Sequence, residues 1–309
     1  MTLPNLVIAG APKCGTSSLF DWLVAHPQVC GSTVKEPFFL IDEGNPLRNA
    51  NCNFHDQGLD AYASFFGHCR GDEKVIVEAT THYIYQRAAL DVLATLPSRP
   101  RVVFVLRKPS ERVLSSFAFS KNNLGNVRPD VSFAEFVRRV RNDPDDPDLQ
   151  AALGRSAYVL VRDLQYSRYV DYLLAWRERL GDDRMRIVLF ESLRAEARLV
   201  LGELCHWLGI DAAFYAGHNF AARNPTLSVR SGRVQRAAMA LARNIPAGLV
   251  KNLLKRAYLV LQSKPPQRAS EADEETLASL EEEFRPQNRR LANEFNVDLS
   301  AWETPASHG

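Results

Sequence analysis

A lysine in a short glycine-containing loop is the first group in this sequence that could do chemistry. The apolar run at residues 6–9 leads into the loop APKCGTSS (11–18), and a helical apolar pattern follows. The free amides and the positive dipole end of a helix N-terminus attract anions, and Lys13 adds a full charge. This stretch predicts a phosphate cradle at a strand–loop–helix junction. The alternative is a turn that serine and threonine cap without any ligand.

The cradle differs from the P-loop of nucleoside triphosphatases. That motif reads G-x-x-x-x-G-K-[ST], with its lysine directly after the second glycine. Gly10 and Gly15 have the required spacing, but Thr16 follows Gly15 and Lys13 comes two residues before it. The ammonium is therefore misplaced for the β- and γ-phosphates of a nucleoside triphosphate. No apolar strand ends in an aspartate suited to Mg²⁺ either.

A second candidate anion-binding group follows the clearest strand, RVVFVLR (101–107). A near-continuous apolar run of this kind is typical of a parallel strand covered on both faces. Arg107 at its end can bind a phosphate through two hydrogen bonds, and Ser115 lies two turns along the helix that Pro109 opens. Taken alone, a structural salt bridge and a helix-face serine explain this pair better.

The elements that must position these groups alternate between strands and helices. We expect strands near 5–9, 75–77, 101–106 and 186–190, and helices at 17–26, 86–96, 109–117, 158–180, 196–208 and 271–295. This order predicts an α/β protein with a P-loop-like three-layer fold, a central parallel sheet with helices on both faces. Ligands bind such sheets at the carboxyl ends of the strands, where Lys13, Glu78, Arg107 and Glu191 all fall. We interpret Glu191 as an orienting residue.

The composition indicates which partners, cysteine chemistry and compartment to expect. The chain has 309 residues and a formal net charge of only +2, so its bulk charge predicts no nucleic-acid partner. Its five cysteines are odd in number and lack CxxC spacing, which argues against a disulfide framework or a zinc site and fits a reducing cytosol. We find no leader pattern and no transmembrane run, and expect a cytoplasmic protein. We expect one domain over 1–302 and a disordered tail at 303–309.

Two stretches carry a resemblance to a known family. PKCGTSSL (12–19) resembles the 5′-phosphosulfate loop of sulfotransferases that use 3′-phosphoadenosine 5′-phosphosulfate (PAPS), and VVFVLRKPSERVLSSF (102–117) resembles their 3′-phosphate segment. VKEPFFL (34–40) is similar to the segment of glycan-modifying members that holds the proposed base. VEATTHYIY (77–85) sits where members have an acceptor-lining stretch, although His82 departs from the pattern. The resemblance covers roughly residues 3–302.

Two later segments extend the resemblance. Tyr169, preceded by Ser167 and Arg168, looks like the family's Ser/Gly-x-Tyr helix. Residues 230–233 occupy the place of a late Lys-Gly-Arg loop, with Ser231 in place of the lysine. The resemblance thus implies that the nucleotide is bound by residues from four segments. They are Lys13, Cys14, Gly15, Thr16, Ser17, Ser18, Arg107, Ser115, Tyr169, Arg230, Ser231, Gly232 and Arg233.

The resemblance implies in-line transfer of a sulfuryl group from PAPS, released as adenosine 3′,5′-bisphosphate, without a metal. The acceptor would be a hydroxyl, less readily an amine, of a carbohydrate, glycolipid or secondary metabolite. The implied catalytic residues are Glu36 as base, Lys13 at the leaving group, Lys35 beside the base, and His82 as a rival base, with His55 a further rival. The alternatives are a P-loop kinase or NTPase of related fold, and a non-catalytic nucleotide-binding protein.

The basic segment 234–262 could meet an anionic acceptor or a membrane surface, but a solvated helix face explains it better. The identity of the acceptor and the oligomeric state are not readable from the sequence.

Overall fold

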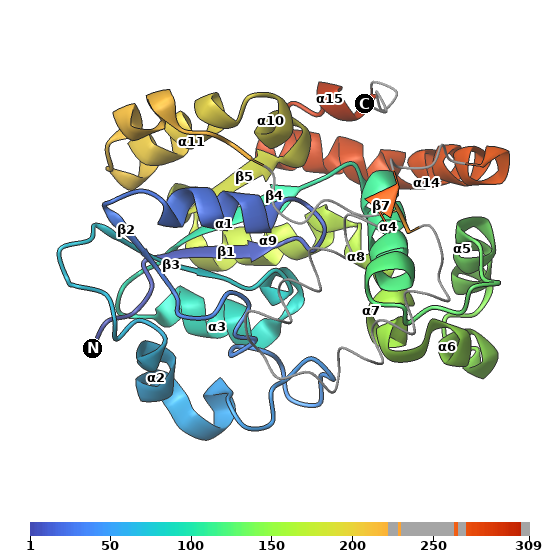
Figure 1. Ribbon diagram of the computed structural model, residues 1–309, viewed down its shortest axis with the longest axis horizontal. Helices are drawn as coiled ribbons and strands as arrows, with labels where there is room; N and C mark the ends of the chain where they lie inside the picture. The colour runs from blue at the N-terminus through green and yellow to red at the C-terminus, as the bar shows by residue number, and fades with distance from the viewer. Residues whose placement is uncertain (222–227, 230–262, 265–269, 304–309) are drawn as a thin grey trace. The chain divides into compact units, whose positions relative to one another are not determined.

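The core of the computed structural model is a five-stranded parallel sheet in the order β2-β3-β1-β4-β5 (Figure 1). The structure describes residues 1–221, 228–229, 263–264 and 270–303. All of β1 and β3 and nearly all of β4 is buried, as continuous apolar strands between two helical layers should be. The predicted α/β fold with a central parallel sheet is confirmed. The strands are β1 (Leu6–Gly10), β2 (Val29–Gly31), β3 (Val75–Ala79), β4 (Arg101–Leu106) and β5 (Met185–Leu189).

Helices cover the sheet. In Figure 1, α1 (Thr16–Val24), α10 (Phe190–Ala195) and α11 (Ala197–Leu208) lie above the strands, and α3 (Arg87–Thr95) lies below them. The indole N–H of Trp176, on α9 (Tyr169–Leu180), donates to the carbonyl of Ile84 over 3.1 Å. Ile84 belongs to the short helix η1 (Tyr83–Tyr85), so this bond ties α9 to the chain that follows β3.

The described residues form two compact units. The first comprises 1–108, 168–224 and 285–309 and holds the whole parallel sheet. The second comprises 109–167 and 225–284 and has its own apolar core around Val113, Phe136 and Phe284. Its elements are α4 (Pro109–Ala118), η2 (Phe119–Asn123), α5 (Phe133–Asn142), α6 (Pro147–Leu153), η3 (Gly154–Ser156), α7 (Ala157–Leu160), α8 (Asp163–Tyr166), the antiparallel strands β6 (Ser228–Val229) and β7 (Ser263–Lys264), and the first part of α14 (Glu271–Phe295). The prediction of a single domain over 1–302 stays a prediction.

Most predicted helices are present, but the long one at 158–180 is wrong. The chain there forms α7, α8 and α9 with breaks between them. The buried guanidinium of Arg112 donates to the carbonyl and carboxylate of Asp163 and to the hydroxyl of Ser167. These bonds complete the end of α8, and Arg168 then leaves the helical conformation with ψ 65°. The break depends on a partner more than fifty positions away in sequence, which helical periodicity cannot reveal.

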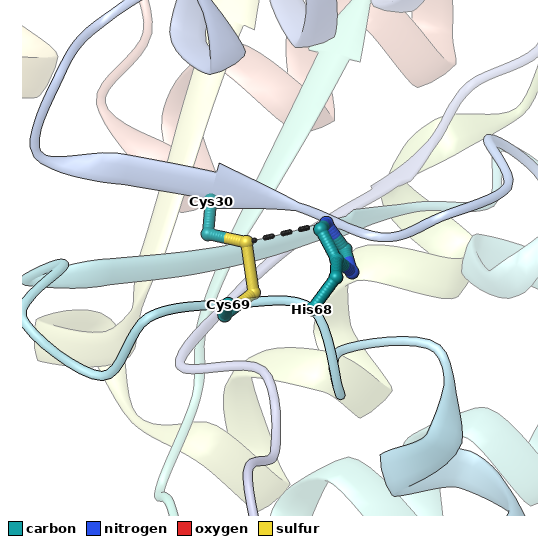
Figure 2. A group of neighbouring side chains, drawn as sticks. All are labelled: Cys30, His68 and Cys69. Atoms are coloured by element: carbon teal, nitrogen blue, oxygen red, sulfur yellow. Dashed lines mark hydrogen bonds between the residues drawn. A yellow bond between two sulfur atoms is a disulfide. The ribbon is translucent and has the colours of Figure 1, made fainter.

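The expectation about the cysteines is also wrong. Cys30 and Cys69 form a disulfide with a Cα–Cα distance of 5.9 Å (Figure 2). Cys30 lies on β2, and Cys69 follows α2 (Phe54–Ser64) on the way into β3. Because β2 pairs with β3, the two segments meet at that side of the sheet although 39 positions separate the cysteines. A count of cysteines and their spacing carries no sign of this pairing.

None of the helices in the described part of the chain is both long and apolar enough to cross a membrane.

Candidate active site

The loop between β1 and α1 has the backbone features of an anion cradle. Gly15 begins α1 in the left-handed conformation, with φ 84°, and a Cβ there would lie 2.8 Å from the Phe190 ring. The amide of Ala11 donates to the carbonyl of Val105 over 2.8 Å, which fixes the loop to β4. Among the described residues no side chain caps α1, and its first turn has no acidic residue. The helix dipole and the first amides are therefore suited to an anion from outside the chain.

Some side chains of this loop carry hydroxyls that could bind an anion, and one packs beneath the loop. Thr16 and Ser18 are buried hydroxyl residues in the first turn of α1, and Ser17 between them is half-buried. Cys14 is fully buried, with its Sγ 3.9 Å from the hydroxyl of Tyr169. The thiol thus fills space beneath the loop, which explains a small apolar side chain at that position.

Lys13 and Arg107 form a pair of cations at the carboxyl ends of β1 and β4. Burial and the positive charge of Arg107 together lower the pKa of Lys13 to about 8, against the opposing effects of Cys14 and Glu36. The Arg107 guanidinium lies 4.9 Å from the centre of the Phe190 ring. A bound anion would relieve the repulsion between these two positive charges, so the pair fits a phosphate-bearing ligand.

Tyr169 and Glu191 hold the Arg107 segment in place. The hydroxyl of Tyr169 donates to the carbonyl of Arg107 over 2.9 Å, which links α9 to the end of β4. Glu191 accepts from the amide of Lys108 through one oxygen and from the indole of Trp302 through the other, over 3.0 and 2.9 Å. These contacts agree with the interpretation of Glu191 as an orienting residue.

Glu36 shares the electrostatic surroundings of Lys13. Its amide donates to the carbonyl of Ala79 over 2.8 Å, so the segment after β2 runs beside the end of β3. Its carboxylate accepts from Lys35 Nζ over 2.8 Å and from Thr81 Oγ1 over 3.1 Å. The Glu36 side chain is 31% exposed and can meet a substrate while these donors fix its direction. The structure thus brings together Lys13, Arg107, Glu36 and Lys35.

The two histidines have different surroundings. His82 is buried directly after Thr81, with ring centres of Phe38 and Tyr85 at 6.2 and 6.0 Å. His55 lies in the first turn of α2, where its Nδ1 is 3.7 Å from a carboxylate oxygen of Glu43. His82 is therefore the histidine beside the Glu36 segment, and its role as a rival base stays a prediction.

A buried carboxylate lies at the end of β3, where the sequence placed one beside the expected ligand site. Glu78, at the end of β3, accepts from the hydroxyl of Tyr62 over 2.9 Å and from that of Thr80 over 2.5 Å. Burial, with a smaller contribution from the charge of Glu36, raises the pKa of Glu78 to about 7 against these hydrogen bonds and one from Tyr83. The Tyr83 hydroxyl also accepts from the amide of Leu40, so this network holds the chain just after Glu36. The strand-end glutamate was visible in the sequence, but its tyrosine partner on α2 was not.

The remaining predicted ligands belong to the second unit or fall outside the described residues. Ser115 is a buried residue of α4 in the second unit. Arg230, Ser231, Gly232, Arg233 and the basic segment 234–262 lie outside the described residues.

Three comparisons place this site among known proteins. The family model "Sulfotransferase domain" matches residues 3–219. The chain is similar to human bifunctional heparan sulfate N-deacetylase/N-sulfotransferase 3, with 22% identity over 67% of this chain and 22% of that protein. It is also similar to mouse carbohydrate sulfotransferase 15, with 25% identity over 67% of this chain and 44% of that protein. The chain thus spans less than half the length of either relative.

A solved structure agrees with the fold. The crystal structure of a sulfotransferase from Alicyclobacillus acidocaldarius superposes with a TM-score of 0.66 and 19% identity, covering 98% of this chain and all of that one. At this identity the likeness establishes the shared fold.

Proposed function

The chain belongs to the sulfotransferase domain family, and we propose that it moves a sulfuryl group from PAPS to a hydroxyl of a carbohydrate. The observation that carries this proposal is the meeting of Lys13, Arg107 and Glu36 at the carboxyl ends of the parallel strands. Two cations there suit a phosphate-bearing donor, and a carboxylate suits removal of a proton from an acceptor. Bound PAPS would supply the transferable sulfuryl group and an anionic leaving group.

The donor would be held by groups that fit phosphates. The α1 amides and the hydroxyls of Thr16, Ser17 and Ser18 would bind the 5′ side, where Lys13 neutralises charge that develops on the leaving oxygen. Arg107 would bind the 3′-phosphate, together with Ser115 as the family resemblance implies. Residues 230–233 and Tyr169 complete the proposed nucleotide contacts, with Tyr169 acting through the Arg107 carbonyl.

Glu36 would take the proton of the acceptor. Thr81 and Lys35 both donate to its Oε1, which leaves Oε2 as the atom that faces the acceptor proton. A base held at a fixed angle within reach of the proton contributes typically about a hundredfold to ten-thousandfold. Lys35 orients this carboxylate through its hydrogen bond to Oε1.

A carbohydrate acceptor is favoured by the relatives, whose names specify heparan sulfate and carbohydrate. Hydroxyl and amine acceptors both need loss of a proton, so the same base serves either. We propose the hydroxyl because it is the acceptor group that the family resemblance implies first.

The test is transfer of labelled sulfate from PAPS to desulfated heparan and a wider glycan panel, read by mass spectrometry. We expect Glu36→Gln to lower the transfer rate at least about a hundredfold while the affinity for adenosine 3′,5′-bisphosphate stays nearly unchanged. The matched control is Glu43→Gln, which alters an exposed carboxylate in the loop before α2 and should leave transfer intact.

A wild-type chain that binds the bisphosphate but sulfates no acceptor would overturn the proposed activity. Full activity of Glu36→Gln would instead refute the assigned base and direct the same experiment to His82→Ala.

A further inference from the structure

Three side chains of the kind that bind zinc meet beside β2, in the first unit. They are Cys30 on β2 and the adjacent residues His68 and Cys69 in the loop after α2 (Figure 2). One ligand atom from each lies within 4.8 Å of the other two. Within the ranges that the structure covers, no fourth His, Cys, Asp or Glu joins this group.

We propose that the reduced chain binds one Zn²⁺ through Cys30, His68 and Cys69, with water as the fourth ligand. Tetrahedral zinc has Zn–S distances of about 2.3 Å and Zn–N distances of about 2.0–2.1 Å, which put a sulfur and a nitrogen ligand about 3.6 Å apart. Cys30 Sγ and His68 Nε2 are already 3.5 Å apart. Two of the three ligand atoms therefore hold a zinc-compatible separation before any movement.

The third ligand becomes available by reduction of the disulfide. A dithiol gives two electrons and two protons to the Cys30–Cys69 bond, and is itself oxidised to a disulfide. The two Cys thiols then lose their protons as both sulfurs bind the ion, so zinc replaces two protons. Once the S–S bond is broken, Cys69 Sγ can rotate about its Cα–Cβ bond without backbone movement.

The three residues differ in solvent exposure, as a metal site with one position open to water requires. Cys30 is buried, Cys69 is half-buried and His68 is exposed. A reductant can reach Cys69, and water can reach a metal from the same side. Soft thiolates with an imidazole favour zinc over hard cations such as Mg²⁺ or Ca²⁺.

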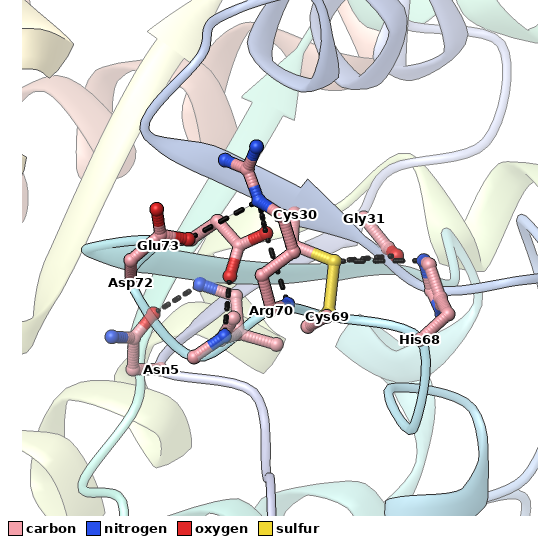
Figure 3. The surroundings of a disulfide bond; sticks show 10 residues. Asn5, Cys30, Gly31, His68, Cys69, Arg70, Asp72 and Glu73 are labelled. Atoms are coloured by element: carbon pink, nitrogen blue, oxygen red, sulfur yellow. Dashed lines mark hydrogen bonds and ion pairs between the residues drawn. A yellow bond between two sulfur atoms is a disulfide. The ribbon is translucent and has the colours of Figure 1, made fainter.

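The charges around the group tolerate a cation. Arg70 follows Cys69 directly, but its guanidinium Nε lies 3.2 Å from Asp72 and 3.3 Å from Glu73 (Figure 3). The two carboxylates more than offset the single arginine charge. The net charge of these neighbouring side chains therefore does not repel a divalent cation.

The choice between metal and disulfide depends on the redox surroundings. Thiols stay reduced in a cytosol and pair in oxidising compartments. In either state one link joins β2 to the loop after α2: a covalent bond when oxidised, a metal bridge when reduced. Five residues after Cys30 the same chain carries Lys35, so this link bears on the segment that presents Glu36.

The experiment titrates the full-length chain with Co²⁺ as a spectroscopic stand-in for Zn²⁺, after reduction and removal of the reductant. We expect one metal per chain, thiolate-to-cobalt charge-transfer bands and visible bands typical of tetrahedral Co²⁺. Zn²⁺ should displace the cobalt and raise the unfolding temperature of the reduced chain. The oxidised chain, with the Cys30–Cys69 peptides linked in a non-reducing digest, should bind none.

Two variants separate the site from adventitious binding. Cys30→Ser and His68→Ala should each weaken binding at least about a hundredfold, since loss of an outer-sphere partner alone costs about 10–100-fold. His68→Ala keeps both cysteines and so can still form the disulfide. Cys52→Ser, which removes a half-buried free thiol elsewhere, is the matched control and should bind like wild type. Absence of stoichiometric metal in the reduced wild type, or undiminished binding in either ligand variant, would overturn the proposal.

Discussion

Lys13 carries its charge in a partly buried loop beside Arg107, and this pairing makes ligand binding depend on pH. Burial and the arginine lower the pKa of Lys13 to about 8. As pH rises through this value the free chain loses the lysine proton, which binding of an anion must restore. The affinity for adenosine 3′,5′-bisphosphate should therefore be steady between about pH 7 and about pH 8, where its phosphates are ionised, and fall above it, by at most about tenfold per pH unit.

Isothermal titration calorimetry at several pH values on either side of 8 measures this profile. Lys13→Arg keeps a charge throughout that range, so its affinity should stay level where wild type declines. An equal decline in both proteins would assign the titration to another group.

Glu78 predicts a pH effect on the stability of the chain, again because the favoured state holds an extra proton. Its pKa is about 7 in the folded chain, above the ordinary value of about 4.3 for an unfolded glutamate. Between these values the folded state holds a proton that the unfolded state has released, so stability falls as pH rises through this window and levels off above 7. The slope from this one group is at most about 1.4 kcal/mol per pH unit.

Urea unfolding of wild type and Glu78→Gln at four pH values from about 5 to about 8 isolates this contribution. Gln cannot titrate, so the wild type should lose stability relative to the variant as pH rises towards 7. A difference between the two proteins that stays constant with pH would contradict a raised pKa at Glu78. Glu43→Gln, at an exposed carboxylate, controls for the substitution itself.

At the scale of elements, the junction of β1 and α1 depends on a single glycine. Gly15 has φ 84°, and an alanine Cβ there would meet the Phe190 ring at 2.8 Å. Gly15→Ala should destabilise the chain by about 1–3 kcal/mol and weaken bisphosphate binding, because both the backbone strain and the clash fall on the cradle.

Gly202 supplies the matched control. It lies within α11, and a Cβ there meets no described atom within 4 Å. Gly202→Ala should stabilise the chain by about 0.5–1 kcal/mol in the same urea unfolding experiment. If Gly15→Ala lowered neither the free energy of unfolding nor bisphosphate binding, the inference that the junction of β1 and α1 requires a glycine would be wrong.

For the whole molecule, the sequence revealed those features whose causes are local. The apolar runs of β1, β3 and β4 are continuous because both sheet faces are covered, and this alone predicted a parallel sheet. The three residues of β2 are too few for such a pattern, so β2 is not among the strands expected from the sequence. The break before α9 and the Cys30–Cys69 bond depend on contacts between distant segments. Local periodicity and residue counts carry no trace of either.

In the candidate site, too, local sequence patterns locate some residues and not others. Lys13 and Arg107 stand at strand ends and could be located from strand patterns, whereas Glu36 required a family resemblance because it follows no strong element. Thr81, Tyr62 and Tyr83 hold Glu36 and Glu78, but their hydrogen bonds to these carboxylates are tertiary contacts that the sequence does not show.

The unfolding temperature of the whole chain, measured with each nucleotide, distinguishes a sulfotransferase from a triphosphatase of related fold. A ligand that binds only the folded state at a hundred times its dissociation constant stabilises it by about 2.7 kcal/mol. Adenosine 3′,5′-bisphosphate without Mg²⁺ should therefore raise the unfolding temperature by several degrees, at about 2–4 °C per kcal/mol for chains of this size or somewhat smaller.

Lys13→Ala and Arg107→Ala should each remove most of that shift, because each deletes a cation of the proposed phosphate sites. ATP with Mg²⁺ should stabilise little, since Lys13 precedes Gly15 and is misplaced for a γ-phosphate. The reverse ranking of the two nucleotides would show that the cradle serves triphosphates.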